Sequence, residues 1–179
     1  IETAIDAVVA RLQATTSRWG RGTTVAQMRQ DWDALFPAEV EARVTPVDVG
    51  GVPGEWVVAP GASEAVLVYL HGGGFQVGSC RSHRELMAGL SAAAGCRVLG
   101  LDYRLAPEHR WPAARADALA AWDGLIAQGL SPRQIALAGD SAGGGLVLQL
   151  LLALRDADRS MPAAAVTLSA WTDLGASGD

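Results

Sequence analysis

The sequence of 179 residues lacks several features that mark specialised classes of protein. It has no run of roughly 18 or more apolar residues, so we expect no helix that spans a membrane. No Lys/Arg cluster is visible and the formal net charge is −5, which gives no support for nucleic-acid binding. The N-terminus has no basic start followed by an apolar stretch, so no signal peptide is evident and a cytoplasmic location is expected.

Cysteine and histidine are also scarce. Cys80 and Cys96 form neither a C-x-x-C pair nor a metal-ligand spacing, which indicates two reduced structural thiols and no metal site. The histidines are His71, His83 and His109. The chain does not begin with Met, so we expect that upstream residues are missing or removed.

The residues that are present predict an α/β protein. Half of them are hydrophobic, and the length suits one domain with a real core. Two helices are expected within residues 1–36, a β-hairpin across 42–60, and buried strands at 65–70, 97–101, 135–139 and 163–169. Further helices are expected after a capping box formed by Ser82 and Glu85, after Pro112, and from about Gly143. This alternation predicts a mostly parallel sheet with helices on both faces.

The stretch Gly139-Asp140-Ser141-Ala142-Gly143 fits the pattern G-x-S-x-G between a predicted strand and a predicted helix. In that context a sharp turn exposes a serine hydroxyl at the top of a sheet, beside the free N–H groups of a helix. The pattern also arises by chance in a chain with 21 glycines, and glycines that open a helix can cradle phosphate. Neither phosphate-loop pattern is matched here, so we favour a nucleophile.

A second motif, His71-Gly72-Gly73-Gly74, follows the predicted central strand. Loops of this type direct a backbone N–H toward the oxyanion of a tetrahedral intermediate. Three glycines allow the backbone to approach a substrate closely, because no side chain stands in the way. The alternative is a plain glycine turn after a strand.

Together HGGGF, DYRLAPEHRWPAA and GDSAGGG closely resemble the hormone-sensitive lipase family of α/β-hydrolases, which includes bacterial carboxylesterases. The resemblance covers nearly the whole chain from about residue 40 onward. It implies an α/β-hydrolase fold with a helical cap segment at residues 1–40 and the N-terminal part of the catalytic domain at 41–179. It also implies a serine esterase or lipase that acts on short- to medium-chain acyl esters and needs no cofactor or metal.

The resemblance also implies roles for individual residues. Ser141 is expected to be the nucleophile, and the oxyanion-hole amides are expected from Gly73, Gly74 and Ala142. His71 is expected to orient the loop, with Asp140 and Glu108 as supporting residues. A structural ion-pair network is expected among Asp102, Arg104 and Glu108. Trp171 and Asp173 resemble an S-P-W-x-D stretch of the family, with Ala170 where proline is usual.

One part of the catalytic machinery is not found. In this fold the nucleophile is followed along the chain by an acid and then by a histidine, but every histidine here precedes Ser141. We therefore expect the acid, the histidine and the C-terminal strands outside this chain, on a second chain that pairs along residues 163–169. The 179-residue piece alone is then expected to be inactive.

The leading hypothesis is a carboxylic ester hydrolase that works through an acyl-Ser141 intermediate. Its partners would be a small ester and the C-terminal remainder of the enzyme, and a homo-oligomer is compatible with the sequence. The alternative is a non-catalytic, receptor-like binding protein of the same fold that lacks the catalytic histidine.

Overall fold

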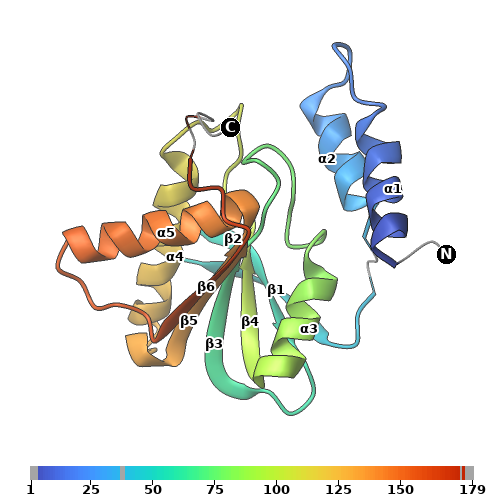
Figure 1. Ribbon diagram of the computed structural model, residues 1–179. Coiled ribbons are helices and arrows are strands. Elements are labelled where there is room, and N and C mark those ends of the chain that lie inside the picture. The colour runs from blue at the N-terminus through green and yellow to red at the C-terminus, as the bar shows by residue number, and fades with distance from the viewer. Residues whose placement is uncertain (1–3, 37–38, 174, 176–179) are drawn as a thin grey trace.

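The computed structural model describes residues 4–36, 39–173 and 175 (Figure 1). Its elements are α1 (Ala4–Thr16), α2 (Val25–Asp33), β1 (Arg43–Val49), β2 (Val52–Val58), β3 (Ser63–Leu70), α3 (Arg84–Ala94), β4 (Cys96–Leu101), α4 (Ala113–Ala127), the 3₁₀ turn η1 (Pro132–Gln134), β5 (Ile135–Asp140), α5 (Ser141–Asp156) and β6 (Ala164–Leu168). The two N-terminal helices, the hairpin and the alternation of strands and helices are confirmed. None of the helices in this described part could cross a membrane.

The strands form one six-stranded sheet in the order β1-β2-β4-β3-β5-β6. The β1–β2 hairpin is antiparallel and β2 is antiparallel to β4, whereas β4, β3, β5 and β6 run parallel to one another. The central strands β3 and β5 are in register, with Leu70 opposite Gly139. The loops that follow them therefore leave the sheet side by side, which is where a ligand site is expected in such a sheet.

Helices cover both faces of the sheet, with α4 and α5 on one side and α3 on the other (Figure 1). Alternation along β3 explains the two layers, because successive side chains of a strand point to opposite faces. Val68 and Leu70 pack with α4 and α5, while Leu67 and Tyr69 pack with α3. Both cysteines lie free and buried in the α3 layer, as the sequence predicts.

Two helix starts differ from the prediction. Helix α3 begins at Arg84, and the Ser82 hydroxyl does not cap it. Instead the hydroxyl accepts a hydrogen bond from the Ser79 N–H at 2.9 Å and donates one to the Ser79 carbonyl at 3.0 Å. The predicted capping box of Ser82 and Glu85 is wrong, because a local turn competes for the serine oxygen. Helix α5 begins at Ser141 rather than near Gly143, so the serine itself opens the helix.

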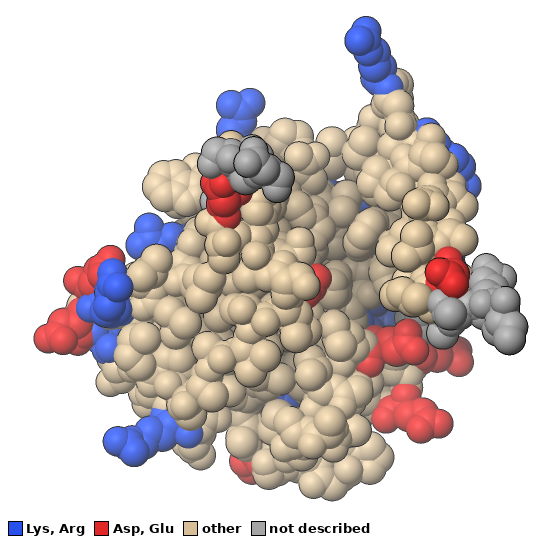
Figure 2. All heavy atoms as spheres, in the orientation of Figure 1, with Lys and Arg blue, Asp and Glu red and all other residues tan. Residues whose placement is uncertain are grey.

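Strand β6 lies at the edge of the described sheet, and all of its residues are exposed. Val166 is 55% exposed and Leu168 41%, and the neighbouring helix α5 exposes Leu148 and Leu152. Figure 2 shows that this side of the molecule has few charged side chains except at its margins. An exposed apolar edge strand is unusual in a stable protein, since its unpaired backbone groups invite further pairing.

Candidate active site

Ser141 lies at the junction of β5 and α5 with a φ of 49°, in the left-handed region. Few residues other than glycine adopt this conformation, and the strain is typical of a functional turn. Glycine is required on both sides of the serine because there is no room for a Cβ at either position. A Cβ on Gly139 would lie 2.6 Å from the carbonyl oxygens of Leu70 and Gly143, and one on Gly143 would overlap the Leu70 carbonyl. The structure thus has the strand–turn–helix geometry of a nucleophile elbow.

The glycine loop after β3 is the second part of the site. Gly73 has a φ of 118° and Gly74 a φ of 62°, both unfavourable for residues with a side chain. The N–H groups of Gln76 and Val77 both donate to the Gly73 carbonyl at 3.0 Å, which closes a tight turn. Ala142 is fully buried in the first turn of α5, where backbone N–H groups have no partner within the helix.

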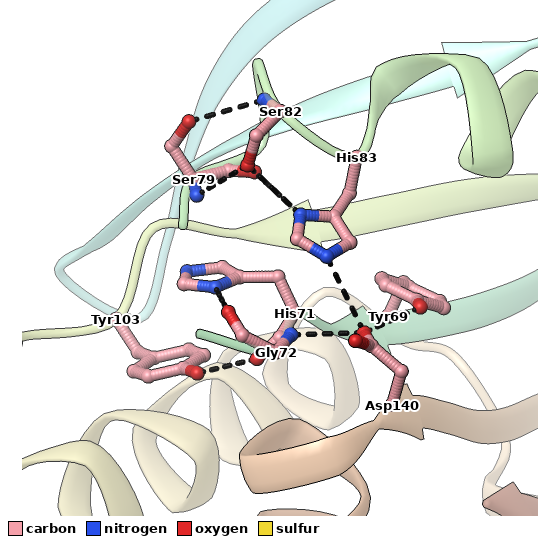
Figure 3. A network of polar contacts seen from close by, with 8 residues as sticks. All are labelled: Tyr69, His71, Gly72, Ser79, Ser82, His83, Tyr103 and Asp140. Carbon is pink, nitrogen blue, oxygen red and sulfur yellow. Dashed lines mark hydrogen bonds and ion pairs between the residues drawn. The ribbon is translucent and has the colours of Figure 1, made fainter. Parts of the chain in front are cut away.

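Asp140 joins this loop to the serine turn (Figure 3). Its Oδ1 accepts hydrogen bonds from the Tyr69 hydroxyl at 2.7 Å and from the Gly72 N–H at 2.8 Å, and it lies 3.4 Å from His83 Nε2. Burial by itself would raise the pKa of Asp140, but the hydrogen bonds from His83, Tyr69 and Gly72 outweigh it, so the pKa lies below its ordinary value. A carboxylate held in this way fixes the position of the glycine loop next to Ser141.

Replacement of Asp140 should therefore weaken the fold in a pH-dependent manner. We expect Asp140→Asn to lower the free energy of unfolding at pH 7 by about 1–3 kcal/mol, because it removes the charge from these hydrogen bonds. A group whose folded pKa is depressed stabilises the fold above its ordinary pKa of 3.8 and loses that effect as the pH falls through the folded value. The gap in the free energy of unfolding between wild type and Asp140→Asn should therefore narrow as the pH falls from 7 to 3.

Urea unfolding at pH 7, 5 and 3 measures this gap. Asp123→Asn serves as the control, since Asp123 pairs with Arg159 in an exposed ion pair away from the loop. A gap for Asp140→Asn that stays constant with pH would show that its carboxylate charge does not hold the loop.

His71 is fully buried and is not placed to act as a base. Its ring stacks on Tyr103 with centroids 4.3 Å apart, and the Tyr103 hydroxyl donates to the His71 carbonyl at 2.5 Å. Its Nδ1 donates to the Gly72 carbonyl at 2.8 Å, so the proton lies on Nδ1. Burial lowers the pKa of His71 to about 4, which keeps the ring neutral at pH 7. These contacts agree with a residue that orients the glycine loop.

The ion-pair network expected among Asp102, Arg104 and Glu108 is not formed. Asp102 accepts a hydrogen bond from the Cys80 N–H at 2.7 Å. Arg104 binds Asp117 of α4 at 2.7 Å, and Glu108 pairs with Arg29 of α2 at 2.7 Å. The expectation of one network is wrong because the loop after β4 passes the turn before α3, helix α4 and helix α2, and each of the three side chains bonds to a different one of them.

The segment after β6 packs onto the start of α5. The Trp171 N–H donates to the Ser141 carbonyl at 2.8 Å, and the Trp171 ring lies 6.3 Å from the ring of Phe75. A Cβ on Gly145 would overlap the Trp171 carbonyl, so this approach needs glycine in the helix. The stretch that resembles S-P-W-x-D thus lies beside both the serine turn and the glycine loop.

Two supporting residues were not found from the sequence. Tyr69 and His83 both bind Asp140, yet neither belongs to a motif quoted above. The signal for Tyr69 is its hydroxyl within an otherwise aliphatic strand, because a buried tyrosine normally bonds its hydroxyl. The sequence holds no comparable signal for His83, which reaches Asp140 only through the tertiary fold.

Comparison with known proteins agrees with this geometry. A family profile described as the α/β-hydrolase fold matches residues 67–179. The chain is 49% identical over 132 residues to an acetyl-hydrolase of Streptomyces hygroscopicus, covering 74% of this chain and 44% of that protein. It is 35% identical over 140 residues to an esterase of Acinetobacter venetianus, covering 78% and 46%.

Among solved structures, an esterase from the bacterial hormone-sensitive lipase family superposes with a TM-score of 0.91 at 44% identity. The match covers 97% of this chain and 59% of that one. The chain belongs to the hormone-sensitive lipase family of α/β-hydrolases. It spans less than half the length of the two curated relatives named above.

Proposed function

We propose that this chain carries the nucleophile and the oxyanion hole of a serine carboxylic ester hydrolase. The observation that carries the proposal is the strained turn at Ser141, which Asp140 ties to the glycine loop at Gly72. Strain of this kind persists only where surrounding contacts enforce it, and it gathers at functional sites. The names of the two curated relatives, acetyl-hydrolase and esterase, support the same reaction class.

In the proposed reaction the Ser141 hydroxyl attacks the carbonyl carbon of an ester. The proton of the hydroxyl passes to a histidine, and the resulting oxyanion is held by the N–H groups of Gly73, Gly74 and Ala142. The positive end of the α5 dipole favours the same charge. Collapse of this intermediate releases the alcohol with the proton and leaves an acyl-Ser141 ester. Water then hydrolyses that ester by the same steps, so neither metal nor cofactor takes part.

We propose that the histidine base and its acid lie outside these 179 residues. His71 is buried and neutral, and both ring nitrogens of His83 are engaged, with Ser82 and Asp140. His109 is exposed on the loop after β4. The exposed β6 edge offers a surface on which the remaining part of the enzyme, as a second chain or a continuation, would pair.

We further propose that the substrates are short- to medium-chain acyl esters and that residues 1–40 form a cap over the acyl pocket. Support for the cap comes from apolar side chains that α1 exposes, among them Ile5 at 65% and Val8 at 53%. Helix α1 therefore presents an apolar surface that a bound acyl chain or the rest of the enzyme would cover.

Two substitutions in the complete enzyme test where the base lies. Loss of a catalytic histidine costs about 10⁶-fold in kcat in a well-studied protease. We expect His109→Gln to leave kcat on p-nitrophenyl butyrate within about threefold of wild type, a factor worth less than 1 kcal/mol. We expect His83→Gln to lower kcat by at most about 10²-fold, because it disturbs only the position of Asp140.

A loss near 10⁶-fold in either variant would place the base within this chain. A complete protein that binds esters but hydrolyses none of them would favour the non-catalytic, receptor-like alternative.

A further inference from the structure

The N-terminal helix α2 contacts the glycine loop directly through Arg29. The Arg29 Nε donates to the Gln76 carbonyl at 2.8 Å, and Nη2 donates to the Ala106 carbonyl at 2.9 Å. The same guanidinium forms a two-pronged pair with Glu108, at 3.0 Å to Oε1 and 2.7 Å to Oε2. One side chain thus joins α2, the turn after the glycines and the loop after β4.

The Gln76 carbonyl belongs to the turn that begins at Gly73. The N–H of Val77 lies in the same peptide as the Gln76 carbonyl and donates to the Gly73 carbonyl, so the peptide that Arg29 holds is part of the ring closing this turn. The neighbouring Phe75 carbonyl accepts from the Ala106 N–H at 2.8 Å, which binds the turn to the loop after β4. A shift of the Gln76 carbonyl would therefore move the Gly73 carbonyl, which shares its peptide plane with the Gly74 N–H.

A second contact lies one helical turn further along α2. Asp33 accepts a hydrogen bond from the Ser79 hydroxyl at 2.8 Å. Residues four apart face the same side of a helix, so Arg29 and Asp33 present one polar face to the loop. Beyond the helix, Phe36 stacks on His83 with centroids 6.3 Å apart.

His83 continues this line of contacts to the other end of the loop. It lies beside Asp140, which accepts the Gly72 N–H (Figure 3). The segment from α2 to Phe36 thus reaches one end of the glycine loop, at Gly72, through His83 and Asp140, and the other end, at Gln76, through Arg29.

We infer that α2 positions the oxyanion loop, with Arg29 as the principal positioning residue, so that the oxyanion hole is complete only when α2 is docked. The inference rests on the proposed function, because it assigns the loop to an oxyanion hole. The expected sizes of the two effects favour a role of Arg29 in positioning the loop over a role in stabilising the fold. The side chain of Glu108 is 50% exposed, and exposed ion pairs contribute little to folding. A small displacement of catalytic groups, in contrast, costs up to about 10²-fold in rate.

The test compares Arg29→Met and Arg29→Lys in the complete enzyme, with Arg159→Met as the matched control. Arg159 also forms an ion pair, with Asp123, but does not contact the loop. We expect Arg29→Met to lower kcat by about 10–10²-fold while KM changes less than about threefold. Arg29→Lys retains one charged donor and should fall between wild type and Arg29→Met. Glu108→Gln keeps both bonds from Arg29 to carbonyls and should lower kcat less than Arg29→Met.

A second measurement does not depend on activity. Amide hydrogen exchange of residues 73–79 should be faster in Arg29→Met than in wild type, with the sheet unchanged and no such effect in Arg159→Met. Unchanged exchange in this loop, or an unchanged kcat in Arg29→Met when wild type is active, would overturn the inference. A wild-type protein that hydrolyses no ester, yet shows faster loop exchange in Arg29→Met, would refute the proposed function while supporting the anchoring of the loop by α2.

Discussion

Ser141→Ala is expected to lower kcat of the complete enzyme on p-nitrophenyl esters by about 10⁶-fold, while the fold is retained. The alanine keeps the Cβ and the left-handed backbone but removes the attacking oxygen. Steady-state kinetics with circular dichroism measure both effects. Ser131→Ala is a suitable control, since Ser131 caps η1 and lies in none of the catalytic motifs. Residual turnover within about 10²-fold of wild type would exclude Ser141 as the nucleophile.

The strained backbone at Ser141 also predicts a difference in stability between two variants of this residue. A left-handed conformation costs a residue with a Cβ roughly 1–2 kcal/mol, and glycine avoids this cost. Ser141→Gly should therefore be as inactive as Ser141→Ala but about 1 kcal/mol more stable than it toward urea. Equal stabilities of the two variants would mean that the turn stores no strain.

The second large effect concerns the glycine loop. Gly73→Ala should lower kcat by about 10²–10³-fold with little change in KM, because loss of one oxyanion donor has that cost. At Gly73 a Cβ would overlap the Val77 carbonyl, and a φ of 118° is not open to alanine, so the turn must move. At Gly74 nothing lies within 4 Å of an added Cβ. Its φ of 62° lies in the left-handed region, which alanine can adopt at a modest cost.

Gly74→Ala is therefore the matched control, and we expect it to lower kcat by less than about tenfold. Initial-rate kinetics of the two variants measure kcat and KM separately. If both variants changed only KM, the loop would bind substrate in the ground state and would not hold the oxyanion.

Local patterns in the sequence predicted most of the fold and the core of the site. The apolar runs at 65–70 and 135–139 indicate buried strands, and the loops after these strands carry HGGG and G-x-S-x-G. Since parallel neighbours end at one edge, two motifs that lie about 70 residues apart come together without any detail of packing. The hydrogen bond from Gly72 to Asp140 is a direct result of that register.

The contacts that the sequence did not predict depend on tertiary packing. Arg29 reaches Glu108 and Ala106, and His83 reaches Asp140, across elements whose mutual positions no local pattern indicates. The failed network of Asp102, Arg104 and Glu108 has the same cause. Charges that are neighbours along a loop point to different elements, so proximity in sequence does not make them partners.

The central claim is that Ser141 is an activated nucleophile, and one measurement tests it most directly. The complete enzyme is treated with an alkyl fluorophosphonate, digested with trypsin and analysed by mass spectrometry. Cleavage after Arg133 and Arg155 gives a peptide in which Ser141 is the only hydroxyl-bearing residue. We expect the phosphonyl group on this peptide, and we expect no labelling of Ser141→Ala. A phosphonyl group on any other peptide, or labelling that persists in Ser141→Ala, would contradict the account.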